Sequence, residues 1–202
     1  MGNQTWVYCI ESERLIAHQV EQKVASGLPV LRVFKNWFYQ IMKREQKPAP
    51  ALPLLQWVQQ ELIRARVAKD EDKQSIIQED VLGYLLKAPG MYGLTTFQKA
   101  SALYMEVATI RPHVPERFHP RLDHLVEQGT AQFPDHSDTP LQALSLPGWT
   151  FFTREEIIEI GPSVRAALAG RHSDSLEYEW NDILTAHEKH QYDWIVFIYP
   201  WT

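Results

Sequence analysis

The sequence predicts an α+β protein: a predominantly helical single domain, residues 1–202, with a small sheet. Three segments support this prediction, because residues 6–10 and 149–152 are aromatic and β-branched and residues 194–199 form an unbroken apolar run. Most of the chain between them carries apolar residues at helical spacing. We therefore expect the three strands to share one sheet that the helices cover.

The two ends of the chain carry the clearest strand signals. In the first segment, Trp6, Tyr8 and Ile10 fall on one face of a strand. The last segment, residues 194–199, is apolar or aromatic at every position, which is typical of a strand buried on both faces.

The N-terminal half is expected to consist of helices separated by turn signals. Ser12 is a suitable cap for a helix that ends at Gly27, and the clearest amphipathic stretch follows over residues 30–47. A Pro-rich connector over residues 47–53 precedes a helix over residues 54–69.

Glycine and proline residues mark further boundaries along the chain. Gly90 and Gly93 bracket a tight loop, after which Thr95 or Thr96 is expected to start a helix. Residues 129–149 are rich in turn signals and predict a long loop, of a length that is often functional.

The helix after residue 152 has a specific start signal. Thr153 and Glu156 form a capping box, and Phe152 with Ile157 completes a hydrophobic staple. The Gly-Pro pair at residues 161–162 is expected to break this helix.

Composition and cysteine content indicate the compartment. With 45% hydrophobic and 22% charged residues, the chain is neither disordered nor collagen-like. The single cysteine, Cys9, excludes an intramolecular disulfide and fits a reducing environment. The apolar run at residues 194–201 is shorter than the roughly 20 residues of a spanning helix. We therefore expect a cytoplasmic protein that does not contact a membrane.

Charge is distributed unevenly along the chain. The first 69 residues carry ten Lys and Arg against five Asp and Glu, whereas the remainder carries ten against twenty. Because phosphate binding depends on clustered Lys and Arg, the acidic majority argues against nucleic acid as the partner. It favours another protein with a basic surface, the alternative being a face that only confers solubility.

Layout at the two ends supports a resemblance to a family. A short strand over residues 6–10 runs directly into a helix, and an aromatic segment precedes the helix start at residues 153–156. Together with the late apolar strand, this layout resembles small bacterial YfbM-like proteins of unknown function. The resemblance does not extend to residues 29–148, and because the family has no agreed chemistry it implies no catalytic residue.

Compact catalytic and nucleotide-binding motifs are absent from the sequence, which contains no phosphate loop, dinucleotide fingerprint, nucleophile elbow or zincin motif. His187 and His190 are spaced to share one helix face, and Asp182 or Asp193 would add a carboxylate if they held a metal ion. An exposed polar helix end explains the same pattern, so we expect no bound cofactor or metal.

A second polar group lies in the middle of the chain. His113, His119, Asp123 and His124 would supply a general base with an orienting carboxylate, joined by His136 from the long loop. A small hydrolase or transferase is therefore the alternative to a binding function. The other explanation is a solvated loop with incidental histidines.

The leading hypothesis is a protein-binding module of the inhibitor or immunity type with an acidic, aromatic-rich surface. A third hypothesis is nucleic-acid binding through the basic aromatic helix over residues 30–47, although its aromatic residues also fit a core stripe. The candidate binding residues for the leading hypothesis are carboxylates of the C-terminal quarter: Glu155, Glu156, Glu159, Glu177, Glu179 and Asp182.

Overall fold

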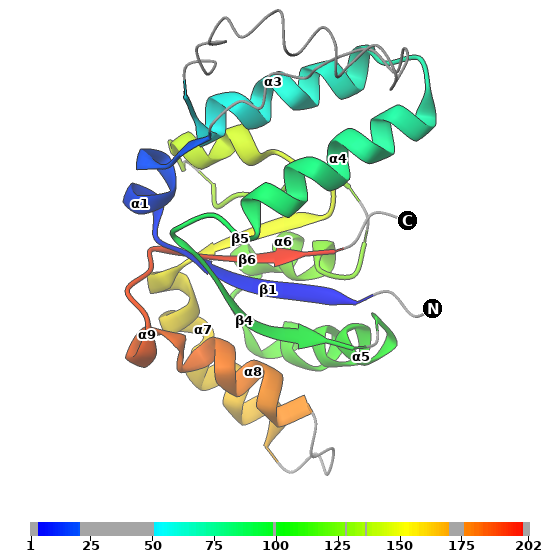
Figure 1. The fold of residues 1–202 in the computed structure, drawn as a ribbon. Helices are drawn as coiled ribbons and strands as arrows, with labels where there is room; N and C mark the ends of the chain where they lie inside the picture. Colours follow the sequence, from blue (N-terminus) through cyan, green and yellow to red (C-terminus); the bar gives the residue numbers. More distant parts are fainter. Residues whose placement is uncertain are drawn as a thin grey trace, which may run out of the picture.

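A four-stranded antiparallel sheet lies between two layers of helices (Figure 1). The strand order is β4-β1-β6-β5, so strands from the two ends of the chain are neighbours at the centre of the sheet. This arrangement confirms the α+β class and the predicted sheet. The structure is a computed structural model that describes residues 4–20, 51–98, 100–127, 129–135, 137–169 and 176–199. The strands of the sheet are β1 (Thr5–Ile10), β4 (Met91–Phe97), β5 (Trp149–Thr153) and β6 (Trp194–Ile198).

The central strands bury side chains on both faces of the sheet. In β1, Val7 and Cys9 point into one core, and Ile10 points into the other. All five residues of β6 are buried and alternate between the two cores in the same way. The prediction of a last strand buried on both faces is therefore confirmed.

Each face of the sheet is covered by its own set of helices (Figure 1). One face packs on α5 (Ala100–Ile110), α6 (His119–His124), α7 (Arg154–Leu168) and α8 (Leu176–Leu184). The other face packs on α1 (Ser12–Ala17), α3 (Leu54–Val67), α4 (Glu71–Leu85) and the 3-10 helix η3 (Pro140–Leu144). The remaining short elements are β2 (Gln19–Val20), β3 (Leu52–Pro53), η1 (Arg111–His113), η2 (Glu116–Phe118) and α9 (Ala186–Lys189).

The predicted helix from Ser12 to Gly27 is wrong, because α1 ends at Ala17. The next residues become extended and form β2, which pairs with β3. The side chain of Ser12 does not cap α1; instead Asp193 Oδ1 accepts a hydrogen bond from the Ser12 backbone N–H at 2.8 Å. A tertiary contact thus decides where this helix starts.

The helix expected at Thr95 or Thr96 is also wrong, because both residues lie in strand β4. They pair with β1, opposite Val7 and Trp6, and α5 begins only at Ala100. β-Branched threonines fit a strand at a sheet edge well. Of the two glycines, Gly90 alone has a positive φ, 93°, and a Cβ there would lie 2.8 Å from the Glu11 carbonyl oxygen.

Two further expectations about the C-terminal half need correction. The Gly-Pro pair at residues 161–162 does not break α7, which continues to Leu168 with Pro162 inside it. Ile160 and Val164 are buried on either side of the proline, so packing holds both halves of the helix on the sheet. The long loop over residues 129–149 contains η3 and a bridge from Gln132 to Thr150.

The capping box at the start of α7 is confirmed. Thr153 Oγ1 accepts a hydrogen bond from the Glu156 N–H at 3.2 Å, and Glu156 Oε2 accepts one from the Thr153 N–H at 2.9 Å. We expect Thr153→Ala to lower the free energy of unfolding by about 1 kcal/mol, because an orphan helix N–H loses its partner. Chemical denaturation measures this change. Thr109→Ala is the control, since Thr109 bonds only a carbonyl within its own helix, and a midpoint as high in T153A as in T109A would contradict the prediction.

Candidate functional site

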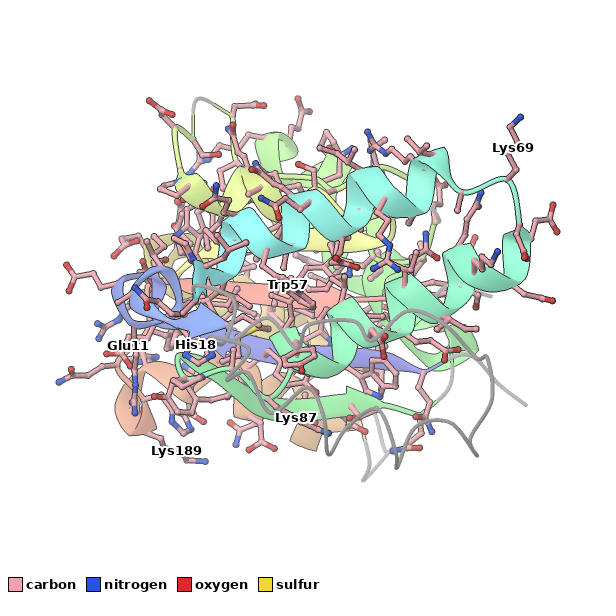
Figure 2. All side chains as sticks on the ribbon, turned by 45° about the horizontal axis from the view of Figure 1, so that its top comes forward. Glu11, His18, Trp57, Lys69, Lys87 and Lys189 are labelled. Carbon is pink, nitrogen blue, oxygen red and sulfur yellow. The ribbon has the colours of Figure 1, made fainter. Side chains whose placement is uncertain are left out.

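A polar surface pocket of about 600 Å³ lies where α1, α7 and the chain before β6 meet. Figure 2 shows Glu11, which directly precedes α1, and Lys189, the last residue of α9, on the same side of the molecule. Its volume falls within the range of ligand pockets, although its lining is more polar than theirs usually is. The lining residues are Glu11, Ser12, Glu13, Arg154, His187, His190, Gln191, Tyr192 and Asp193.

Asp193 joins the walls of the pocket. Its backbone N–H donates to the Ile10 carbonyl at 3.0 Å, and its carbonyl accepts from the Arg154 N–H at 3.0 Å. Its side-chain Oδ1 accepts from the Ser12 N–H at 2.8 Å. One exposed residue therefore holds the end of β1 and the starts of β6, α1 and α7 in a fixed relation.

A stack of two rings stands beside the carboxylate of Glu11. The rings of Tyr92, on β4, and His190 lie 5.8 Å apart and nearly parallel, at 19°. The Tyr92 hydroxyl donates to Glu11 Oε2 at 3.2 Å and accepts from Arg14 Nη1 at 2.6 Å. Arg14 Nη1 also lies 3.7 Å from Glu11 Oε2, so one oxygen of this carboxylate is held in place.

Arg154 and Tyr192 form the wall on the α7 side. The guanidinium carbon of Arg154 lies 5.9 Å from the centre of the Tyr192 ring, a cation–π distance. Burial raises the pKa of Tyr192 to about 12, although the charge of Arg154 opposes this rise. The phenol therefore stays neutral at physiological pH. Within the described ranges, Arg154 makes no ion pair.

The histidine pair predicted from the sequence lines this pocket but does not sit on one helix face. His187 lies in α9, whereas His190 follows the helix with extended backbone. The proposed third ligands are engaged elsewhere: Asp182 lies 3.7 Å from Lys189 Nζ, and Asp193 accepts from Ser12. Among the described residues, no three His, Cys, Asp or Glu side chains are placed to hold a metal ion.

The mid-chain group lies away from the pocket. Asp123 forms a two-pronged ion pair with Arg111, at 2.7 and 3.2 Å. His119 Nε2 lies 3.1 Å from the Val114 carbonyl oxygen, and His124 is buried with its Nδ1 2.6 Å from Thr150 Oγ1. Burial lowers the pKa of His124.

The other two histidines of the mid-chain group are His113, which belongs to η1, and His136, which lies outside the described residues. None of the four candidates (His113, His119, Asp123 and His124) lines the pocket.

Three of the six predicted binding carboxylates are paired with cations. Glu156 is mostly buried and bonds Arg121 through both oxygens at 2.6 Å. Glu159 pairs with Arg117, and Asp182 with Lys189. Because these charges are offset within the protein, they contribute less to an acidic surface than the sequence suggests.

The other three carboxylates differ among themselves. Glu155 is exposed in the first turn of α7 and has no bonded partner among the described residues. Glu179 has one oxygen buried without a hydrogen-bond partner, and the side chain of Glu177 lies outside the described part of the chain. Among the members of the predicted set that the structure describes, Glu155 is thus exposed and unpaired.

Sequence reasoning missed the carboxylates of Glu11 and Glu13 at the pocket. Both follow directly after β1, and the charge of Glu13 has no bonded partner among the described residues. No local pattern distinguishes them from ordinary surface glutamates. Glu11 and Glu13 line the pocket only because α1 lies beside the residues that precede β6.

One buried acid was also not apparent in the sequence. Glu106, on α5, is 1% exposed, and its Oε2 accepts a hydrogen bond from Trp180 Nε1 at 2.6 Å. Burial raises the pKa of Glu106 to about 7; the bond from Trp180 opposes this rise and the charge of Glu179 adds to it. This acid lies in the core and not in the pocket.

Comparison with known proteins does not assign the pocket. No protein-family model, curated protein or solved structure matches the chain. The resemblance in layout to YfbM-like proteins therefore stays a prediction. The predicted basic aromatic helix over residues 30–47 lies outside the described residues, and no helix in the described part of the chain is long and apolar enough to cross a membrane.

Proposed function

We propose that this chain is a protein-binding module of the inhibitor or immunity type whose partner presents a basic surface. The supporting observation is the excess of carboxylates around the pocket. Glu11, Glu13 and Asp193 line it, and Glu155 lies next to Arg154 at its α7 wall. Glu13 and Glu155 carry charges that no described residue offsets.

This surface has the features that favour association with a basic protein. Exposed carboxylates raise the rate of encounter with a positive surface through long-range attraction. Tyr92 and His190 add planar rings beside the charges, and aromatic side chains are enriched where proteins bind one another. The surface thus combines an electrostatic attraction with rigid groups that a partner can pack against.

Charge reversal at the pocket tests the proposed function. We expect wild-type protein to retain a stoichiometric partner from its native source and Glu13→Lys/Glu155→Lys to lose it. The matched control is Glu79→Lys/Asp80→Lys, because these carboxylates are exposed on α4, over the other face of the sheet.

Salt dependence provides the second measurement. The Debye length falls from about 10 Å at 0.1 M salt to 3 Å at 1 M, so the association rate with the retained partner should fall over this range. The Glu13→Lys/Glu155→Lys protein should associate slowly at every salt concentration, because it lacks the two charges whose attraction the salt screens. Equal partner recovery by both double variants would refute the proposed function.

A further inference from the structure

We propose that α8 is a pH-sensitive clamp on the core, which opens locally when Glu106 loses its proton. This helix, orange in Figure 1, lies on the sheet face that also carries α5 and α7. A single buried polar contact, from the Trp180 indole to the Glu106 carboxyl group, joins it to α5. The inference is independent of the proposed function, because Glu106 lies outside the pocket.

Glu106 and Trp180 meet in a buried contact between α5 and α8. Both residues are buried, and Trp180 Nε1 donates to Glu106 Oε2 at 2.6 Å. The Trp180 ring also packs against Phe97 and Phe197, with ring centres 5.9 and 6.0 Å away. Because aromatic side chains hold the indole in place, the Glu106 carboxyl group is shielded from water as long as α8 stays closed.

The buried contact stabilises a negative charge on Glu106 poorly. Glu106 Oε1 is buried without a hydrogen-bond partner, and so is one oxygen of Glu179, the residue before Trp180. Burial raises the pKa of Glu106 to about 7; the Trp180 bond opposes this rise, and the charge of Glu179 adds to it. Ionisation of Glu106 therefore creates a buried charge near a like charge, which contact with water would relieve.

The charges around Glu106 do not offset its ionisation. α5 packs against α7, η1 and β4, and Glu106 itself reaches α8. In the described part of these elements, Glu179 is the residue whose charge acts on the pKa of Glu106, and it acts unfavourably. The other titratable residues of these elements, none of which contributes to the shift, are Tyr92, Arg111, His113, Arg154, Glu155, Glu156, Glu159, Arg165 and Asp182.

The element that can yield to this charge is α8. It has nine residues, fewer than the roughly 12 that a helix needs to be stable by itself. Its position therefore depends on packing, and its described buried side chains are Trp180, Ile183 and Leu184. By contrast, β6 is hydrogen-bonded to a strand on either side. Opening of α8 alone thus brings water to Glu106 without breaking the sheet.

Native-state amide hydrogen exchange on the full-length protein tests the inference. Exchange is followed by NMR from pH 5 to pH 8 and corrected for the intrinsic rate at each pH. We expect the amides of residues 180–184 to be at least about tenfold less protected than those of β6. Their protection should fall by about 70-fold over this range, because Glu106 has its ordinary pKa once α8 is open. Equal protection of α8 and β6 would mean that α8 opens only with the whole protein, and would overturn the inference.

Glu106→Gln shows whether the proton controls the opening. Glutamine keeps an oxygen for the Trp180 N–H but cannot ionise, so the protection of α8 should change by about threefold at most over the same pH range. Glu79→Gln, on α4, is the control that should follow the wild type. A fall as steep in Glu106→Gln as in the wild type would overturn the inference.

A measurement on the wild type keeps the inference falsifiable if Glu106→Gln does not fold. The indole N–H signal of Trp180 reports directly on the carboxyl group that accepts its hydrogen bond. We expect the chemical shift of this signal to titrate with a midpoint near pH 7. A signal that does not move between pH 5 and pH 8 would show that Glu106 does not ionise in this range, and would overturn the inference.

Discussion

Deletion of residues 194–202 is expected to unfold the protein completely. The deletion removes β6, which hydrogen-bonds β1 on one side and β5 on the other. All five of its residues are buried, and they contribute to both cores. Burial of a large apolar side chain stabilises a fold by about 1.5–3 kcal/mol, so this loss is roughly 10 kcal/mol, comparable with the whole stability of a domain.

Circular dichroism during thermal and chemical denaturation measures the effect. The truncated chain should lack a cooperative transition, whereas deletion of residues 200–202, which follow β6, should retain one. A cooperative melt in the longer truncation at the wild-type temperature would show that β6 is dispensable.

The protein is also expected to lose stability through Glu106 as the pH rises from 4.5 to 7. Burial raises the pKa of Glu106 from 4.5 to about 7 in the folded protein. Between these values the folded protein keeps a proton that the unfolded chain releases, so folding becomes less favourable as the pH increases. The total loss is about 3 kcal/mol, and it levels off above the folded pKa.

Comparison of wild type with Glu106→Gln isolates this effect. Glutamine keeps an oxygen that can accept the Trp180 N–H but carries no charge at any pH. The stability difference between the two proteins should therefore shift in favour of the variant by about 3 kcal/mol between pH 4.5 and pH 8.

Because the comparison uses the difference in stability between the two proteins, the pH dependence that other titrating groups add to both proteins cancels. Burial lowers the pKa of His124, which adds a pH dependence of opposite sign to both proteins. Chemical denaturation at several pH values gives the difference, with the exposed Glu79→Gln as the control that should parallel wild type. A stability difference that does not vary with pH would contradict the prediction.

Strong local signals made much of the fold predictable. The unbroken apolar run of β6 and the alternating faces of β1 identified the central strands, because burial on both sides constrains every position. The capping box at Thr153 identified the start of α7, because its reciprocal bonds need only residues three apart in sequence.

Predictions failed where a distant segment supplies the deciding contact. Thr95 and Thr96 are compatible with a helix or a strand, and pairing with β1 makes them a strand. The chain after His18 leaves the helix because it pairs with residues 52–53. In both cases hydrogen bonds across the fold outweigh a weak local preference.

The sequence by itself determined the fold class, the central strands and an acidic C-terminal part. Only the tertiary structure decided which charges are free. It pairs Glu156 with Arg121 in the interior. It also brings the residues after β1 beside Asp193, whose carboxylate accepts the Ser12 backbone N–H across 181 positions of sequence. The physical reason is that the position of a charged group depends on which segments the sheet places together. Here the pairing of β1 with β6 at the centre of the sheet brings the residues of the pocket together.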